Sequence, residues 1–524
     1  MIPIQAVNGA TSKHAFSFDW GRTTTSNHYA ARAGKEYGYK VIVEPGTRNI
    51  YIVGKRGTQP SEETTPGGVS DYHWAERAYI LKLDQQGNVL WNRELSKDGQ
   101  NNDPVSSQRW RRYSKFNDIC INSLTGDLYC VGYTDAQYPD HYNWSTLTGD
   151  CLVAKYNSSG TLQYQKFYGR NKTDAGQGVE WFPLEEQYAG CRALSDGTFV
   201  ASGGTFNHPG SNSYVVTGTI NQNVMLTRWN SNGTVSWSKW ISIDGTQNNA
   251  TTQVSSTGGG IGGVDSSNNI YFIATGGTNG STRGSYIMKF NSSGTLQWQK
   301  SISGIFFNSN LNWYNLWSDM TVSKSGDIYL MSYRGSGNDH GIVKLNSSGT
   351  VQWTKSFPGN TDNTSTLFID EEGNLWLGSY FGKFICVDSN GNIVRRMEIT
   401  TNGAGGFFQS FTVDEGYVTV IASGRYLGTQ TSVSREQTLS VFRFEISGVN
   451  NGSFTHTNSD GSTLTVTVSG PSSSSPSSYT NPSVSNSSQV SVINYAGNTP
   501  TRLNNGTCTN FTNSSPPNSS TLTV

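Results

Sequence analysis

Residues 287–298 read IMKFNSSGTLQW, two short apolar runs joined by the polar turn Asn-Ser-Ser-Gly. An aromatic residue follows the turn glycine by four positions. Glycine supplies a positive φ and Asn or Asp bonds its own backbone, so this pattern predicts a tight β-hairpin. Four other stretches repeat it with Asp or Asn opening the turn and Trp or Tyr closing the unit: residues 80–91, 153–164, 226–237 and 342–353.

A second hairpin precedes the first one in each unit. In the first copy it comprises residues 41–43, a turn at Pro45-Gly46, and residues 50–54. Matching pairs are residues 119–121 with 128–132, and 320–322 with 328–331. Two hairpins make four antiparallel strands. Such a unit cannot bury both of its faces alone, and radial stacking of several units builds a β-propeller.

The turn glycines show how long each unit is. The intervals are 73 residues from Gly87 to Gly160, 73 to Gly233, 61 to Gly294, 55 to Gly349 and 42 to Gly391. The shortest interval approaches the roughly 40 to 45 residues of a minimal blade, so the excess elsewhere is loop.

Two weaker units follow. The sixth covers residues 368–391 and has Arg395 where the aromatic residue is expected; the seventh uses residues 411–413, 417–421, 441–444 and 452–454. We therefore predict an all-β fold, a propeller of about seven four-stranded antiparallel blades over residues 41–456. Six blades with a separate C-terminal unit is the alternative.

Two ends lie outside the blades. Residues 1–40 form an N-terminal arm whose alternating residues 16–20 predict a strand that closes the ring at the last blade or packs beneath it. Residues 457–524 form a Ser/Thr/Asn-rich extension with short alternating stretches at 464–468, 490–492 and 522–524. Alone, such a tail buries too little apolar surface to offset its chain entropy. We expect a neighbouring subunit to hold it, with tail strands added to that partner's sheet edge.

Two repeated side chains have structural interpretations. The aromatic residue that closes each unit lies on the outermost strand, and we expect it to pack between adjacent blades. The Lys or Arg two residues before the turn Asn or Asp is expected to point to solvent.

The hairpin repeat, with its Asn/Asp-x-x-Gly turn and closing Trp, resembles the seven-bladed repeats of bacterial surface proteins and of tailed-bacteriophage virion proteins. It is more distantly similar to the repeats of quinoprotein propellers. The resemblance covers the blades only. It implies the fold, and it implies a virion component as one function that this fold serves.

Composition narrows the possible partners. The 37 basic and 37 acidic residues balance, whereas a sequence-independent nucleic-acid binder is basic. No apolar run approaches the length of a transmembrane helix, and the first residues lack the pattern of a secretory signal. The protein is therefore expected either to be made and assembled in a cytoplasm or to leave it by another route, without nucleic-acid binding or membrane insertion. Together with the resemblance of the repeat, these features favour a virion component assembled in a host cytoplasm. The six cysteines form no Cys-x-x-Cys, and we expect buried free thiols.

The candidate binding site lies in long loops on the face opposite the short turns. Elaborated loops on a rigid scaffold commonly carry recognition, and exposed aromatic rings favour sugar stacking or protein contacts. The alternative is that these aromatic side chains plug the central channel or cover the hydrophobic core. The candidate residues are Trp110, Tyr113, Trp181, Phe182, Phe306, Phe307, Trp313, Trp317, Phe407 and Phe408.

Catalysis has little support in the sequence. The seven His residues form no metal-spaced pair, and no nucleophile elbow, P-loop or dinucleotide fingerprint occurs. We expect no catalytic residue, no metal and no cofactor. The predicted function is a structural and recognition component of a phage tail, baseplate or fibre attachment. Its partners are other virion proteins, further copies of itself in a symmetric assembly, and a host surface glycan. The alternatives are a polysaccharide lyase or glycosidase, and a bacterial adhesion module.

Overall fold

The structure is a computed structural model. It describes the strands and turns of the blades and several short segments beyond them: residues 17–23, 36–57, 76–97, 114–134, 150–168, 185–206, 224–243, 261–276, 284–303, 319–334, 339–357, 365–379, 382–401, 406–424, 438–446, 452–457, 463–469, 477–478, 483–486, 490–494, 501–502 and 506–509.

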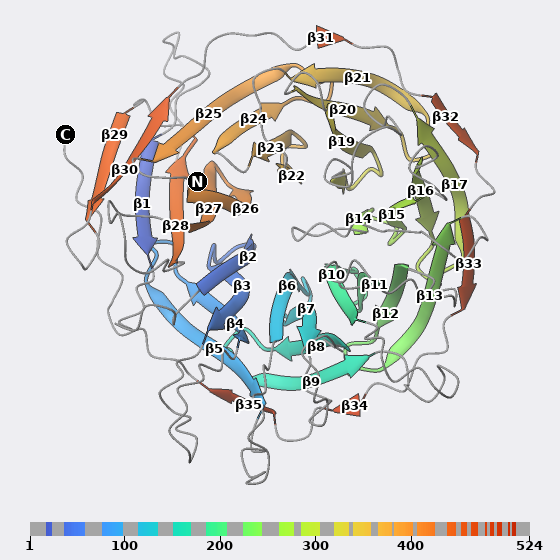
Figure 1. Cartoon of the computed structure of the whole chain (residues 1–524), viewed down its shortest axis with the longest axis horizontal. Helices are drawn as coiled ribbons and strands as arrows, with labels where there is room; N and C mark the ends of the chain where they lie inside the picture. Colours follow the sequence, from blue (N-terminus) through green and yellow to red (C-terminus); the bar gives the residue numbers. More distant parts are fainter. Residues whose placement is uncertain are drawn as a thin grey trace, which may run out of the picture.

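Seven antiparallel sheets stand radially around a central axis, which confirms the predicted all-β propeller and fixes its blade number at seven (Figure 1). Each of the first six blades runs from an inner to an outer strand. In blades one to three the strands are β2 (Glu36–Val43), β3 (Ile50–Gly57), β4 (Glu76–Leu83), β5 (Val89–Lys97); β6 (Ser114–Ile121), β7 (Leu128–Thr134), β8 (Asp150–Tyr156), β9 (Leu162–Tyr168); β10 (Glu185–Ala193), β11 (Phe199–Phe206), β12 (Val224–Trp229) and β13 (Val235–Ile243).

Blades four to six follow the same order. Their strands are β14 (Ile261–Val264), β15 (Ile270–Gly276), β16 (Gly284–Phe290), β17 (Leu296–Ser303); β18 (Met320–Val322), β19 (Ile328–Arg334), β20 (Asp339–Leu345), β21 (Val351–Phe357); β22 (Ser365–Ile369), β23 (Leu375–Ser379), β24 (Lys383–Val387) and β25 (Ile393–Thr401). The described residues contain no helix.

The seventh blade joins both ends of the ring. Its inner strands are β26 (Gly406–Asp414), β27 (Tyr417–Gly424) and β28 (Thr438–Glu445), and its outer strand is β1 (Ser17–Thr23), which pairs antiparallel with β28. The N-terminal strand therefore closes the ring, one of the two positions that its alternation allowed. The prediction that residues 452–454 supply this outer strand is wrong: β29 (Gly452–Thr457) pairs with β30 in the sixth sheet.

The C-terminal extension runs back around the outside of the ring (Figure 1). One tail strand pairs antiparallel with the outer strand of each blade from six to one, in reverse order. These strands are β30 (Thr463–Ser469) on β25, β31 (Ser477–Ser478) on β21, β32 (Ser483–Asn486) on β17, β33 (Val490–Asn494) on β13, β34 (Thr501–Arg502) on β9 and β35 (Gly506–Thr509) on β5. We call β30–β35 the belt. Strand addition to a sheet edge was expected, but the edges it uses belong to this same chain.

The hydrophobic core is divided among the seven blade interfaces. Each buried cluster draws its side chains from two neighbouring blades; Tyr51 and Val53 of blade one, for example, pack with Phe116 and Leu128 of blade two. The seventh blade meets the first through Ile421 and its neighbours. Stability therefore depends on contacts between blades, as the repeat pattern requires.

An aromatic latch connects successive blades. Trp91 at the outer edge of blade one donates from Nε1 to the carbonyl of Ser158 in the turn of blade two, at 3.2 Å. Its ring lies directly against Gly160, where an added Cβ would come within 2.7 Å. Trp237 and Trp353 donate to the equivalent carbonyls of Ser292 and Ser389. The predicted packing of this aromatic residue between blades is confirmed.

The repeated Lys or Arg lies in the same interface, so its predicted exposure to solvent is wrong. Lys82 is 7% exposed and its Nζ donates to the Ser158 carbonyl at 3.1 Å. The ammonium also lies 3.3 Å from Glu44 and 4.8 Å from the centre of the Tyr51 ring. A carboxylate, a carbonyl and an aromatic face replace the water that it loses.

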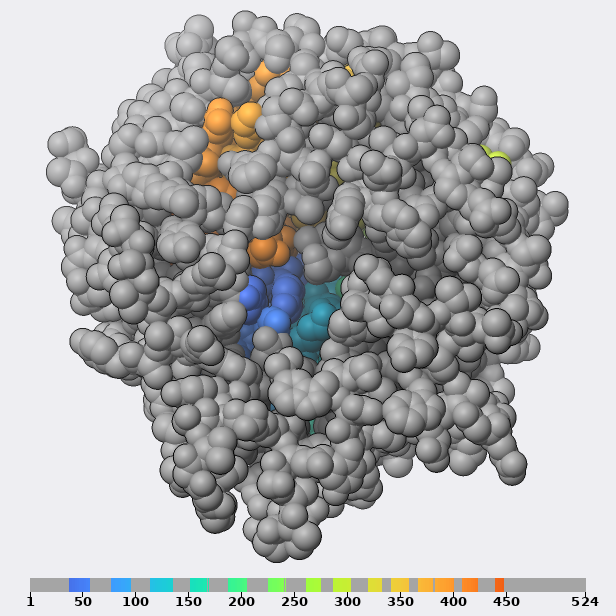
Figure 2. Space-filling view, in the orientation of Figure 1, coloured from blue at the N-terminus to red at the C-terminus, as the bar shows by residue number. Residues whose placement is uncertain are grey.

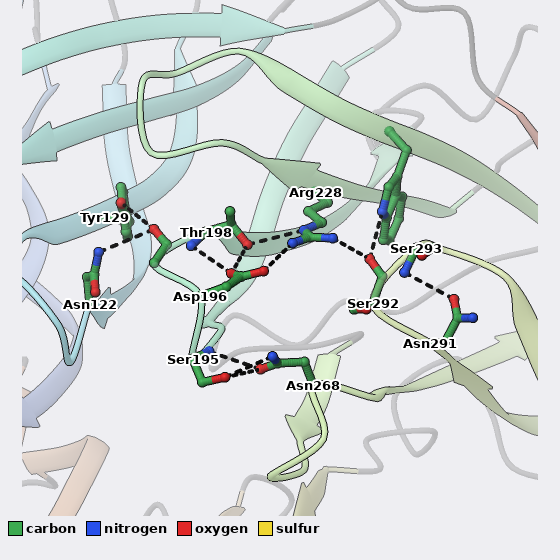
Figure 3. Close-up of polar contacts among 12 residues, drawn as sticks. Asn122, Tyr129, Ser195, Asp196, Thr198, Arg228, Asn268, Asn291, Ser292 and Ser293 are labelled. Atoms are coloured by element: carbon green, nitrogen blue, oxygen red, sulfur yellow. Dashed lines mark hydrogen bonds and ion pairs between the residues drawn. The ribbon is translucent and has the colours of Figure 1, made fainter.

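Figure 3 shows the same arrangement between blades three and four. Arg228 forms an ion pair with Asp196 in its own blade and donates to the Ser292 carbonyl of the next at 2.7 Å. Beside it, the main-chain N–H of Ser195 donates to Asn268 Oδ1 at 2.9 Å and joins the inner turns of the two blades. Polar contacts thus continue from each turn to the next.

The latch predicts a difference between two glycines that share a backbone conformation. Gly160 and Gly46 have φ of 80° and 83°, but a Cβ at Gly46 would meet nothing within 4 Å. We expect Gly46→Ala to lower the free energy of unfolding by about 1 kcal/mol, because alanine is strained in the left-handed backbone conformation. Gly160→Ala should cost about 1–3 kcal/mol more, because its methyl group displaces the Trp91 ring. Urea denaturation measures both losses, and equal losses would contradict the latch.

Candidate functional site at the central hollow

The inner strands of four consecutive blades contain a β-bulge at one level. In β26, β2, β6 and β10 the pairing register shifts by one residue at the same distance from the inner turn. The extra residues are Gln409, Tyr39, Asn117 and Ala189. In β14 of blade four the shift lies nearer the turn, at Gly262. A bulge turns side chains away from the regular alternation and is common beside functional sites. Blades seven, one, two and three therefore present a distinct surface to the centre of the ring.

A glycine on the neighbouring strand makes room for three of these bulges. A Cβ at Gly54, Gly132 or Gly203 would lie 1.7–1.9 Å from the carbonyl oxygen of the bulged strand. Only glycine permits this approach. The spacing of the repeat does not predict these bulges, although the sequence carries a signal for them: a glycine occupies the same position of the second strand in blades one to three.

Aromatic and cationic side chains lie beside the bulges of blades one and two, in β2 and β6. The rings of Tyr37 and Tyr39 stack with centroids 6.2 Å apart and planes 8° apart. Lys55 Nζ lies 4.7 Å from the centre of the Tyr37 ring, and Lys115 Nζ lies 6.0 Å from both the Tyr39 and the Tyr133 rings. Tyr133 is buried and the other four are half-buried. We call these five residues the tyrosine–lysine cluster.

This part of the molecule borders a hollow at the centre of the ring. Figure 2 shows the hollow with atoms of the first blade (blue) and the second blade (teal) along its edge. The inner strands β2 and β6 are the parts of these blades nearest the axis (Figure 1). A concave site with aromatic walls and a few polar groups is the usual form of a ligand site.

Two amide side chains continue the surface into blade three. Asn117, the bulged residue of β6, donates from Nδ2 to the Tyr188 carbonyl at 2.7 Å and to Gln187 Oε1 at 3.3 Å. Asn117 is buried, whereas Gln187 remains half-buried. Asn117 thereby orients the Gln187 amide.

Four charged residues lie on the inner strands or directly before one: Lys40, Asp118, Arg192 and Asp319. Asp118 is fully buried and accepts the main-chain N–H of Cys191 at 2.9 Å and the Arg192 guanidinium at 2.9 Å. Asp319, before the inner strand of blade five, accepts the N–H groups of Met320 and Leu367 at 2.9 and 2.8 Å. Each carboxylate thus joins its blade to the next one.

The charges act on one another across the hollow. Burial is the main cause that raises the pKa of the Asp319 carboxyl, while two main-chain amides and the positive charges of Lys40 and Arg192 partly oppose that rise. Lys40 and Arg192 lie on the inner strands of blades one and three, and Asp319 lies on blade five. The centre of the ring therefore contains charges of both signs.

The ten aromatic residues predicted for the site have separate outcomes. The prediction that Phe408 is a binding residue is wrong, because Phe408 is 8% exposed and packs edge-on against Phe384 with ring centroids 6.0 Å apart. It belongs to the core between blades six and seven. Phe407 lies on β26 with its backbone opposite Ser423. The remaining eight lie outside the described residues: Trp110, Tyr113, Trp181, Phe182, Phe306, Phe307, Trp313 and Trp317.

The cysteine side chains that the structure describes form no disulfide. Five cysteines are buried free thiols, as expected: Cys120, Cys130, Cys151, Cys191 and Cys386. Within the described ranges no three His, Cys, Asp or Glu side chains gather closely enough to hold a metal ion. The same residues include no apolar helix that could cross a bilayer.

Comparison with known proteins leaves the function open. No protein-family model and no curated protein matches the chain. One similar solved structure is a protein of unknown function from Dyadobacter fermentans, at 10% identity and a TM-score of 0.35; the match covers 63% of this chain and 93% of that one. Another is the hydrazine synthase of Kuenenia stuttgartiensis, at 9% identity and a TM-score of 0.40; the match covers 75% of this chain and 96% of that one. Such low TM-scores and identities carry no argument about function. The chain is a seven-bladed β-propeller with a C-terminal belt.

The raised pKa of Asp319 predicts a pH dependence. Its folded state holds a proton more tightly than its unfolded state, so its contribution to stability is complete below the ordinary value of 3.8 and is lost as pH rises through the raised pKa. Relative to Asp319→Asn, the wild-type protein should therefore lose stability as pH rises above about 4. Urea denaturation of both proteins across this range measures the difference. A relative gain for the wild type would contradict the raised pKa of Asp319.

Proposed function

We propose that this chain is a non-enzymatic structural and recognition protein, in which a rigid propeller binds its ligand at the central hollow. The tyrosine–lysine cluster beside the bulges carries the proposal. A structural repeat would keep its inner strands regular, yet four neighbouring blades depart from regularity at one level. Bulges often turn side chains toward a functional site, and two of these four carry half-buried residues, Tyr39 and Gln409.

The chemistry of the cluster favours an acidic glycan as ligand. Tyrosine rings offer rigid, amphipathic contact area on which the C–H face of a sugar ring can stack. Lys55 and Lys115 supply ammonium groups for a carboxylate, and the Gln187 amide supplies hydrogen bonds for hydroxyl groups. Lys40, next to Tyr39 on the same inner strand, adds a further positive charge.

Two carboxylates whose contacts the structure describes, Asp118 and Asp319, are used between blades. General acid–base catalysis of glycoside cleavage needs a carboxyl group free to exchange a proton with the substrate. Asp118 and Asp319 instead accept main-chain N–H groups of the neighbouring blades, and Asp118 also pairs with Arg192. Both are engaged in holding the inner ring together.

A virion is the setting we propose for this recognition protein, in a tail, baseplate or fibre attachment. The resemblance of the hairpin repeat to those of tailed-phage virion proteins supports it, as does the neutral charge balance. In this setting the glycan is presented by the host surface.

Binding of glycans tests the proposal. We expect the protein to bind glycans rich in uronic or sialic acid in preference to neutral ones. Tyr39→Ala and Lys115→Ala should each weaken binding by at least about tenfold, or 1.4 kcal/mol, because each removes a contact at the centre of the cluster. Isothermal titration of ligands selected on a glycan array measures this change.

Leu124→Ala is the matched control. Leu124 is 66% exposed on the inner turn of blade two, at the opposite end of the strand pair that contains Lys115, so its variant should bind normally. Equal binding by all three variants would contradict the site. Release of new sugar ends during incubation would contradict the non-enzymatic role and favour the polysaccharide-cleaving alternative.

A further inference from the structure

The belt pairs with one half of each outer strand. Residues near the turn, such as Trp237 in β13 and Trp298 in β17, belong to the latch. Pairing with the belt begins beyond them, at Lys239 in β13 and at Lys300 in β17. In blade five it likewise begins at Lys355, two residues after Trp353. The outer half-strands thus form a row of equivalent edges around the ring, which we call the outer edges.

These edges accept different sequences. The tail strands that occupy them read TLTVTVS, SS, SVSN, VSVIN, TR and GTCT, with no shared motif and one charged residue, Arg502. What the six pairings share is antiparallel main-chain hydrogen bonding. Strand addition takes its affinity from the main chain, so an outer edge discriminates weakly among extended, uncharged segments.

Each pairing is also short. The registers comprise two residue pairs for β31 and β34, four for β30, β32 and β35, and five for β33. A pairing of two to five residues contributes few hydrogen bonds, and each adds only a small net stability because water competes for the same groups, so no single attachment holds the belt. The belt is held by its several attachments and by its covalent tether to the propeller.

We infer that the outer edges are an interaction surface for strand exchange, and that the partner they fit is the tail of a second copy of this chain. A second copy presents the same main-chain groups and the same side chains as the tail in place. The contacts within one chain and between two chains are therefore equivalent, and the choice depends on concentration. Within one chain the tether favours the closed belt; between crowded copies in an assembly the tails exchange and join neighbouring propellers. This inference rests on the belt and is independent of the ligand proposed for the hollow.

Disulfide trapping in the full chain tests it. Ser242 of β13 faces Ser491 of β33 across the register, and Ser301 of β17 faces Ser485 of β32. With Cys508→Ser as background, one protein carries Ser242→Cys and another carries Ser491→Cys, so a disulfide between these positions must join two chains. Directly opposed strand residues satisfy the distance that a disulfide requires.

Two oxidation experiments compare cross-linking within one chain and between two chains. A single chain with both substitutions, oxidised at micromolar concentration, should form the disulfide within one chain and keep the monomer mass. The two single variants, mixed at about 1 mM, should form at least about tenfold more disulfide-linked dimer than a mismatched mixture of Ser301→Cys with Ser491→Cys. The mismatched mixture keeps the same tail cysteine but pairs it with an outer-strand position outside its register.

Either of two results would overturn the inference. Dimer yields that are equal for matched and mismatched mixtures mean that the belt stays within its own chain at every concentration. Failure of the double variant to cross-link within one chain means that β33 does not occupy β13. Glycan binding by these variants, measured in parallel, reports on the hollow separately.

Discussion

The contact of one blade's aromatic latch with the next blade's turn is the interaction on which the remaining structure depends. A single carbonyl, that of Ser158 between blades one and two, accepts both the Trp91 indole and the Lys82 ammonium, and Gly160 admits the ring because it has no Cβ. This geometry requires a positive φ, a flat side chain and a long cation at fixed spacing. Those requirements explain why the repeat is so regular in residues that are far apart in the sequence but in contact in the fold.

The repeat is weakest where the ring closes, and other residues take over its contacts there. Arg395 replaces the aromatic residue of blade six and donates to the Ile446 carbonyl at 3.2 Å. In blade seven, Arg443 donates to the Gln85 carbonyl of blade one at 2.6 Å and lies 4.0 Å from the centre of the Tyr417 ring. The N-terminal strand supplies the missing outer strand. Closure therefore preserves the hydrogen-bonding pattern of the latch while changing the residues that form it.

The two ends of the blades have different roles. At the turn end, the latch and the paired turns fix one blade against the next. At the other end, the bulged inner strands and the tyrosine–lysine cluster depart from the repeat, and the belt pairs with the loop-side halves of the outer strands. Regularity at one end provides the rigid frame on which irregularity at the other can position a ligand site.

The sequence by itself determined the blade, its turns and the position of the latch aromatic, because these follow from local hydrogen bonding and from periodic burial. Tertiary structure alone decided the rest. Phe408 is a loop aromatic by its sequence position, but the bulge between Phe408 and Ser410 and its packing on Phe384 place it in the core. Lys82 is a surface residue by its type, yet Glu44, Tyr51 and Ser158 from three other segments surround it. The tail's short strands carry no sequence signal for their partners, since edge pairing depends on main-chain groups that every residue has and on which edge lies within reach.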